Sequence, residues 1–156
     1  MSETILKKSV WVPRDLPELF PFFANAENLG LLTPSWLKFE ILTPRPIEMR
    51  VGALIDYRIR LRGFPMRWRT EITAWNPPFE FVDEQRRGPY RLWRHRHWFE
   101  ERDGGTVCHD EVRYIPFGGW LADRLFVRRD VERIFAYREQ RMREVFAQKT
   151  WQAGVL

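Results

Sequence analysis

The stretch Ile55–Arg62, which reads IDYRIRLR, alternates strictly between an apolar or aromatic residue and a charged one. Because successive side chains of a β-strand point to opposite faces, this pattern predicts a strand with one covered face and one wet face. The predicted inner face carries Tyr57 among aliphatic residues, and the outer face carries Asp56 and arginines. Such one-sided burial is typical of an antiparallel sheet.

The same period of two recurs further along the chain. The segments Arg67–Ala74, Arg91–Phe99 and Thr106–Tyr114 each separate apolar or aromatic residues from most of their charged residues in this way. Breaks rich in glycine and proline lie between them, at Gly63–Pro65, Asn76–Pro78, Gly88–Pro89 and Gly104–Gly105. Short breaks of this kind indicate hairpin turns. The central part of the chain is therefore predicted to be a run of antiparallel strands.

Helical patterns flank this run. Asp15 and Glu18 have the spacing of a helix N-cap followed by a carboxylate in the first turn, where Pro17 is tolerated. A second short helix is predicted over Glu27–Leu32. Near the other end, Trp120–Gln148 repeats apolar residues every three or four positions, which predicts one long amphipathic helix. Its apolar stripe consists of Leu121, Leu125, Val131, Ile134, Phe135, Met142, Val145 and Phe146.

Composition excludes several classes of protein. The 156 residues are 44% hydrophobic and 15% aromatic, too apolar for a disordered chain. The single cysteine, Cys108, allows no internal disulfide, and no secretory signal or membrane-spanning run is recognised. We therefore expect one soluble, cytoplasmic domain over residues 1–156. The net charge of +5 comes from 22 Arg and 4 Lys spread along the whole chain, so DNA is not an expected partner.

The predicted order is a strand, two short helices, about six strands and one long helix, which makes an α+β fold. The long helix must lie across the covered face of the sheet, because it cannot bury its apolar stripe alone. This order resembles the START-related (SRPBCC) superfamily, which includes birch-pollen allergens, polyketide cyclase/dehydrases and coenzyme-Q-binding proteins. The resemblance runs from about Thr4 to Gln148 and rests on Val12–Phe20, Glu27–Leu29, Thr33-Pro34, Gly52, Trp75–Pro78, Phe81–Gln85, Trp93–Phe99, Asp110–Tyr114 and the final helix.

The resemblance implies a helix-grip fold, in which a curved antiparallel sheet of about seven strands wraps around the long C-terminal helix above a hydrophobic cavity. It also implies a small stand-alone ligand-binding member of the superfamily. It does not fix the function, because members range from lipid carriers to enzymes.

Polar residues on the predicted inner faces mark the candidate site. His95 and His97 alternate with Trp93 and Phe99, and carboxylates share the inner face of neighbouring strands. Buried polar groups need partners, so these residues are expected to bond one another, water or a ligand. The candidate ligand-binding residues are Tyr57, Trp68, Thr70, Asp83, Gln85, Trp93, His95, His97, Phe99, Asp110, Tyr114 and Phe117.

Two interpretations of the histidines remain open. They are either interior histidines satisfied by Asp110 or Asp83, or groups that orient the polar end of a largely hydrophobic ligand. Within the second interpretation, His95, His97 and Asp110 are candidates for acid–base catalysis. His-x-His lacks a third ligand at a recognisable spacing, so neither a metal nor a cofactor is expected.

Two further features concern the surface. Arg58, Arg60, Arg62, Arg67 and Arg69 are predicted to share the outer face of one hairpin, which Arg94 and Arg96 extend. This face is either simply solvated or contacts an acidic partner, an anionic membrane surface or RNA. The apolar loop Ile115–Leu121 is predicted either to border the cavity mouth or to touch a membrane, or else to plug the core with Phe117 and Trp120.

The favoured function is the binding or transport of a hydrophobic small molecule, such as a lipid, isoprenoid or polyketide-like compound, by a monomer or homodimer. The alternative is a cyclase- or dehydratase-type enzyme that uses the same histidines and aspartates as acid and base. An interaction module acting through the arginine-rich face ranks last.

Overall fold

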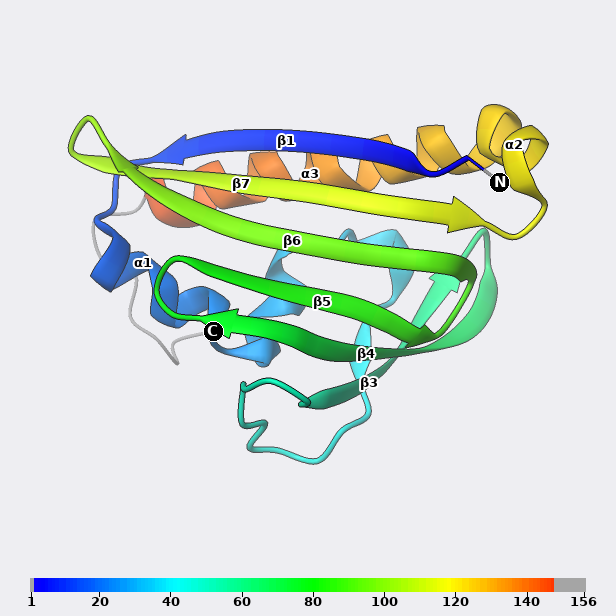
Figure 1. Ribbon diagram of the computed structural model, residues 1–156, viewed down its shortest axis with the longest axis horizontal. Coiled ribbons are helices and arrows are strands. Elements are labelled where there is room, and N and C mark those ends of the chain that lie inside the picture. Colours follow the sequence, from blue (N-terminus) through cyan, green and yellow to red (C-terminus); the bar gives the residue numbers. More distant parts are fainter. Residues whose placement is uncertain (1, 148–156) are drawn as a thin grey trace.

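One curved antiparallel sheet of seven strands dominates the computed structural model, which describes residues 2–147. The strands are β1 (Thr4–Val12), β2 (Glu40–Ile41), β3 (Leu54–Leu61), β4 (Phe64–Asn76), β5 (Glu80–Arg87), β6 (Tyr90–Arg102) and β7 (Gly105–Pro116). Their order across the sheet is β1-β7-β6-β5-β4-β3-β2 (Figure 1). From β2 to β7, each strand therefore lies beside the strand that follows it in the sequence, and β1 pairs with β7. The α+β helix-grip fold is confirmed.

The alternation in the sequence becomes the two faces of this sheet. In β3, Ile55 and Ile59 are buried, whereas Arg58 and Arg60 are exposed. Irregularities in the pairing of β4 with β5 interrupt the ladder between Ile72 and Ala74, and such bulges bend a sheet. The bend produces a concave face on which a helix can lie.

The short helices after β1 form where the sequence predicts them. Helix α1 (Leu16–Phe23) begins at Asp15, whose side chain accepts a hydrogen bond from the backbone N–H of Glu18. The 3₁₀ helix η1 (Ala26–Leu32) follows, and a second 3₁₀ turn, η2 (Ser35–Leu37), was not predicted.

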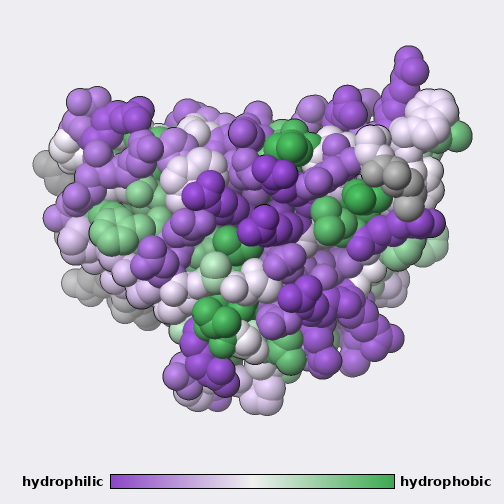
Figure 2. Space-filling view, viewed as in Figure 1, coloured by the Kyte–Doolittle hydropathy of each residue, from purple (hydrophilic) through white to green (hydrophobic). Residues whose placement is uncertain are grey.

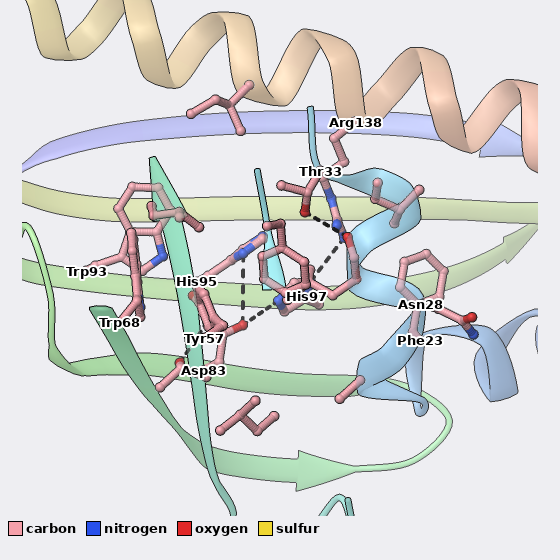
Figure 3. Close-up of a pocket in the computed structure, with 18 of the residues that line it drawn as sticks. Phe23, Asn28, Thr33, Tyr57, Trp68, Asp83, Trp93, His95, His97 and Arg138 are labelled. Carbon is pink, nitrogen blue, oxygen red and sulfur yellow. Dashed lines mark hydrogen bonds and ion pairs between the residues drawn. The ribbon is translucent and has the colours of Figure 1, made fainter. Parts of the chain in front are cut away.

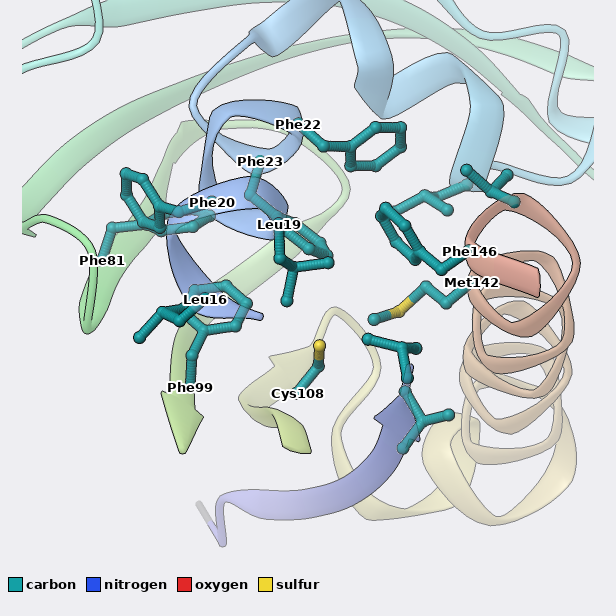
Figure 4. Close-up of a cluster of buried hydrophobic side chains, with 14 residues drawn as sticks. Leu16, Leu19, Phe20, Phe22, Phe23, Phe81, Phe99, Cys108, Met142 and Phe146 are labelled. Carbon is teal, nitrogen blue, oxygen red and sulfur yellow. The ribbon is translucent and has the colours of Figure 1, made fainter. Parts of the chain in front are cut away.

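Aromatic residues of α1 pack into a closed cluster with the sheet and the end of the long helix (Figure 4). Phe20 lies edge-on to Phe99 with the ring centroids 5.8 Å apart, and Phe23 lies 5.0 Å from Phe99. Cys108 is buried in the same cluster, where burial raises the pKa of its thiol to about 12. A thiol in this state is a packing group and not a nucleophile.

The long helix is interrupted by one π turn. It consists of α2 (Gly119–Ala122), the π-helical η3 (Asp123–Val127) and α3 (Arg128–Ala147); the predicted end at Gln148 lies outside the described residues. Figure 1 shows α3 behind β1 and β7, on the far side of the sheet from the viewer. No helix within residues 2–147 is both long and apolar enough to cross a membrane.

One prediction about the apolar stripe is wrong at its N-terminal end, where the π turn lies. Leu121 and Leu125 are 51% and 56% exposed, so they do not belong to the buried stripe that contains Val131, Phe135 and Met142. A π turn takes in one extra residue, which rotates the preceding segment by about 100° relative to a regular α-helix. The leucines that the α-helical period places on the inner face are therefore turned outward.

Candidate functional site

A pocket of about 180 Å³ lies between the concave face of the sheet, α3 and the short helices η1 and η2 (Figure 3). On the same measure a single water molecule needs about 10–15 Å³, so the space admits a small organic molecule. Most of the wall is aliphatic or aromatic. Seven of the predicted ligand-binding residues line it: Tyr57, Trp68, Thr70, Asp83, Trp93, His95 and His97.

The aromatic part of the wall is built by cross-strand contacts. Tyr57 of β3 and Trp68 of β4 are paired in the sheet and stack with their ring centroids 5.6 Å apart. Trp93 of β6 lies perpendicular to Trp68 at 5.2 Å, and Phe135 of α3 lies 6.4 Å from Trp93. The indole N–H of Trp68 is buried without a hydrogen-bond partner in the described part of the chain.

The other five predicted residues lie outside the lining of the pocket. Phe99 belongs to the closed cluster around α1, and Asp110 lies behind the histidines. Gln85 holds the backbone of Tyr90, because its amide nitrogen donates to the Tyr90 carbonyl at 2.7 Å and its oxygen accepts from the Tyr90 N–H at 3.2 Å. The alternation correctly places Phe99 and Asp110 on the inner face, but both lie away from the pocket.

Tyr114 and Phe117 are the remaining two. The Tyr114 hydroxyl donates to Asp123 at 2.8 Å, so this tyrosine fixes the π turn. Phe117 is 57% exposed and Trp120 is 69% exposed, so neither plugs the core.

The most polar part of the wall belongs to a buried ion cluster, defined as Asp83, His95, His97, Asp110 and Arg138, of which all but Asp110 line the pocket. His95 Nε2 lies 2.7 Å from an oxygen of Asp110, and His97 Nε2 lies 2.7 Å from an oxygen of Asp83. Figure 3 shows the two histidines side by side, with Asp83 on one side and Arg138 reaching in from α3. The ring centroids of the histidines are 3.6 Å apart.

Strand register brings these groups together. His95 is paired with Asp83 of β5, and His97 is paired with Asp110 of β7. Each histidine bonds the carboxylate opposite its neighbour, which is the diagonal reach expected between adjacent strands. The sequence therefore predicts the histidine–carboxylate pairing correctly.

Arg138 completes the cluster and was not predicted. It is 6% exposed, and its Nε donates to Asp110 at 3.2 Å. Its position was detectable, because it lies three residues after Phe135 and four before Met142 on the apolar stripe of α3. A charged residue on such a stripe needs a buried partner.

The protonation states follow from burial and neighbours. Burial, together with the positive charge of His97, lowers the pKa of His95 to about 4 despite its bond to Asp110. Burial also opposes the charge on His97, but its hydrogen bonds to Asp110 and Asp83 outweigh burial and raise its pKa. Arg138 Nη2 lies 3.4 Å from His97 Nδ1, which is a contact and not a hydrogen bond once His97 carries both protons.

Both carboxylates of the ion cluster are ionised. Burial works against the charge on Asp110, but Arg138 and the two histidines hold its pKa well below the ordinary value. Burial likewise opposes the charge on Asp83, and the His97 hydrogen bond with the nearby positive charges lowers its pKa. The two carboxylates thus face Arg138 and His97, whose pKa is raised, whereas the lowered pKa of His95 keeps that histidine neutral.

Asp83, His95 and His97 also offer ligand-type atoms within 4.8 Å of one another. Two ligands on one tetrahedral zinc ion, each about 2.0–2.1 Å from it, are roughly 3.3 Å apart. His97 Nε2 is closer than this to Asp83, at 2.7 Å, and His95 Nδ1 is farther from the same oxygen, at 3.9 Å. In this arrangement the three residues form a hydrogen-bonded group.

On the outer face, arginines pair with carboxylates. Arg69 makes a two-point bond to Asp56 at 2.8 and 2.9 Å, and Arg58 pairs with Glu40. Arg62 departs from the predicted outer row. It lies at the β3–β4 turn with φ of +49° and binds Asp130 of α3 through two nitrogens at 3.0 Å. Figure 2 shows the outer face as mostly hydrophilic, with apolar residues in separate small patches.

Solved structures share this fold. The ZhuI aromatase/cyclase from Streptomyces sp. R1128 superposes with a TM-score of 0.75 at 13% identity, covering 99% of this chain and 100% of that one. Protein CV1439 from Chromobacterium violaceum has a TM-score of 0.74 at 10% identity, covering 94% and 99%. Major latex-like protein 151 from Panax ginseng has 0.65 at 9% identity, covering 94% and 99%.

These identities establish a common fold and nothing more. No curated protein sequence matches this chain significantly. The sequence profile described as "Polyketide cyclase / dehydrase and lipid transport" matches residues 12–143, which is most of the chain. The protein therefore belongs to the polyketide cyclase/dehydrase and lipid-transport family, within the SRPBCC superfamily.

Proposed function

We propose that the protein binds a small, largely apolar molecule in the pocket and holds a hydroxyl group of that molecule against His95. The observation that carries the proposal is a buried histidine on the wall of a mostly apolar pocket, with its Nε2 held 2.7 Å from Asp110. The aromatic wall formed by Tyr57, Trp68 and Trp93 would supply most of the affinity through burial and ring contacts.

The chemistry expected of the ligand follows from the tautomer of His95. Ionised Asp110 can only accept hydrogen bonds, so the proton of neutral His95 lies on Nε2, which faces Asp110 at 2.7 Å. Nδ1 is then an acceptor, and no donor within residues 2–147 reaches it. Its nearest charged neighbour is a carboxylate oxygen of Asp83 at 3.9 Å. A ligand that donates a hydrogen bond, such as a phenol or an enol, therefore fits this position.

A second candidate function, polyketide cyclisation, draws on the same geometry. A histidine whose Nε2–H is held by a carboxylate and whose Nδ1 is free has the arrangement of a general base. A base works best when its pKa lies near the working pH, and the pKa of His95 is lowered to about 4. Binding without turnover is therefore the stronger proposal.

A matched pair of probes tests the binding proposal. The affinities of 1-naphthol and its methyl ether are measured by titration calorimetry against the purified protein. We expect the naphthol to bind about 3- to 10-fold more tightly, the range of one neutral hydrogen bond. The preference should vanish in His95→Leu and persist in His109→Leu, whose histidine lies on the outer face against Trp98.

Two outcomes count against the proposal: neither probe binds the wild-type protein, or the preference for the hydroxyl survives in His95→Leu. Native mass spectrometry of protein from its own host would identify any ligand that copurifies. Incubation with a poly-β-ketone, followed by mass spectrometry of the products, tests the enzyme alternative. A cyclised product that is lost in His95→Leu would promote catalysis over binding.

A further inference from the structure

Five large apolar side chains project into solvent where β7 leads into the long helix. We call this group the apolar tip; its members are Phe117, Trp120, Leu121, Leu125 and Phe126. They are between 48% and 69% exposed. Scattered apolar residues are normal on a protein surface, but five exposed large apolar side chains within residues 117–126 favour an interaction site.

The apolar tip is held in place by buried bonds. Asp123 of the π turn is 4% exposed and accepts hydrogen bonds from Tyr114 at 2.8 Å, Arg128 at 2.9 Å and Thr4 at 3.1 Å. Because these bonds fix Asp123 inward, Leu121 and Leu125 remain on the outside. The exposure of the apolar residues is therefore built into the fold and is not fraying of a helix end.

Arginines surround the apolar tip. Arg91 lies over the ring of Phe117 at 5.7 Å, and Arg62 lies over the ring of Phe126 at 5.1 Å. Arg124, Arg128 and Arg129 are exposed on the same helical segment. The two nearest helical acids, Asp123 and Asp130, are paired with Arg128 and Arg62 of this group, so Arg91, Arg124 and Arg129 supply its remaining positive charge.

This surface adjoins the pocket. Leu61 and Tyr90 line the pocket, and each is followed directly by an arginine of the rim, Arg62 or Arg91. The β3–β4 turn, the β5–β6 turn and the start of the long helix meet at this end of the sheet (Figure 1). A molecule that reaches the protein at the apolar tip is thus close to the pocket.

We propose that the apolar tip docks onto an anionic phospholipid surface. Aromatic and leucine side chains with a rim of arginine match the two parts of such a surface, the acyl boundary and the negative headgroups. A second copy of the chain is a poorer occupant, because it would bring the same positive rim against this one. The inference goes beyond ligand binding, since it concerns a surface outside the pocket.

Sedimentation with lipid vesicles tests the proposal. We expect the wild-type protein to pellet with vesicles of phosphatidylcholine and phosphatidylglycerol, weakly with phosphatidylcholine alone, and less as salt rises. Trp120→Ser/Leu125→Ser should lower the partition coefficient about tenfold or more, because it removes two of the five apolar side chains of the tip. Phe79→Ser is the matched control, since Phe79 is 56% exposed in the β4–β5 turn at the opposite end of the sheet.

The charge contribution has its own matched pair. Arg124→Gln/Arg129→Gln should weaken binding to anionic vesicles, by about fivefold for each arginine. Arg60→Gln/Arg67→Gln removes the same charge from the outer face of the β3–β4 hairpin and should have a smaller effect. The pocket variant His95→Leu should bind vesicles like the wild type, which separates this inference from the proposed function.

Three results would overturn the proposal. The first is no binding of the wild type to anionic vesicles at low salt. The second is an equal loss in the Trp120→Ser/Leu125→Ser variant and in Phe79→Ser. The third is a wild-type dimer, detected by light scattering, that the double variant dissociates while neither protein binds vesicles. Thermal melting followed by circular dichroism confirms that the variants are folded, as expected for exposed positions.

Discussion

The same sheet and the same helix enclose two different interiors. Around α1, Phe20, Phe23 and Phe99 pack ring against ring, with centroids 5.0 to 5.8 Å apart (Figure 4). Further along α3, the space between sheet and helix holds the pocket and the buried ion cluster (Figure 3). Phe23 and Phe81 join the two regions, because both also line the pocket. The ring of Phe81 stacks on His97 at 4.1 Å and also contacts Phe20.

The two interiors differ in the contacts that hold them: ring packing in one, and hydrogen-bonded ions beside the pocket in the other. The aromatic rings of the closed cluster interdigitate at the close packing of a protein interior, which leaves no space for a ligand. Hydrogen-bonded ions hold their distances, and here they connect β5, β6, β7 and α3. We therefore expect the ion cluster to act as a spacer between sheet and helix, beside which apolar side chains leave room for a ligand.

Removing the cation of the spacer should have the largest effect. Arg138→Met leaves the Asp110 carboxylate buried with less compensating charge, and we expect a loss of about 3–5 kcal/mol in the free energy of unfolding. Arg143→Met on the same helix is the control, because Arg143 is exposed and its i,i+4 pair with Glu139 contributes less than about 0.5 kcal/mol. Urea denaturation measures both. Equal small losses would show that the ion cluster does not hold the interior open.

The second-largest effect is expected from truncating one phenylalanine in each interior. The loss in the free energy of unfolding should differ between the two. Phe99 and Phe135 are buried to a similar degree, at 6% and 4% exposure, but only Phe135 lines the pocket. We expect Phe99→Ala to lower the free energy of unfolding by about 3–4 kcal/mol and Phe135→Ala by roughly half as much. The reason is that Phe135 already faces open space and loses fewer contacts.

Urea denaturation of the two alanine variants measures this difference. A pocket ligand should stabilise Phe99→Ala about as much as the wild type, because Phe99 lies outside the pocket and binding favours the folded state of both. If Phe135→Ala lowers the free energy of unfolding more than Phe99→Ala does, the side chains around the pocket are not less closely packed than those of the closed cluster.

The ion cluster also predicts how stability depends on pH. The pKa of His95 is lowered to about 4, so the unfolded chain binds the extra proton first, and stability falls as pH drops from about 6.5 to 4. This fall amounts to about 3 kcal/mol. The pKa of His97 is raised, so its stabilisation is full below about 6.5 and is lost as pH rises through its folded pKa. Stability should therefore be greatest near pH 6.5.

Thermal melting across pH 4 to 9 measures the profile. His95→Phe should flatten the acidic side between pH 4 and 6.5, because its ring remains neutral. The lowered pKa values of Asp83 and Asp110 add a further loss only at lower pH, as pH falls through their folded values. A profile with no acidic slope in the wild type would contradict the assigned state of His95.

The sequence predicted the faces of the strands better than positions along them. Alternation correctly turned His95, His97 and Phe99 inward, yet β6 is long enough that Phe99 lies in the closed cluster and the histidines lie at the pocket. The alternating pattern shows which face of the sheet a side chain occupies, but it does not show how far along the strand that residue lies from the pocket. The resemblance to a helix-grip fold supplied the overall arrangement of sheet and long helix.

Two site features were missed for different reasons. Arg138 was visible as a charge on an apolar stripe, and its buried partner was to be expected. The pocket residues from η1, such as Asn28, were not predictable, because 3₁₀ segments and the loops around them have no repeating pattern. The π turn was hidden as well, since its cause is the tertiary bond between Tyr114 and Asp123.

Substitutions on the outer face of the sheet should have the smallest effect on the free energy of unfolding. Arg69 and Asp56 make a two-point bond with good geometry, but both side chains are at least 40% exposed. Water screens such a pair, so Arg69→Gln is expected to leave the free energy of unfolding almost unchanged. The change should shrink further in 1 M salt, whereas the loss in Arg138→Met should persist, because salt does not reach a buried charge. Urea denaturation at both salt concentrations measures the contrast, and a large effect at Arg69 would show that the outer arginines do more than solvate the sheet.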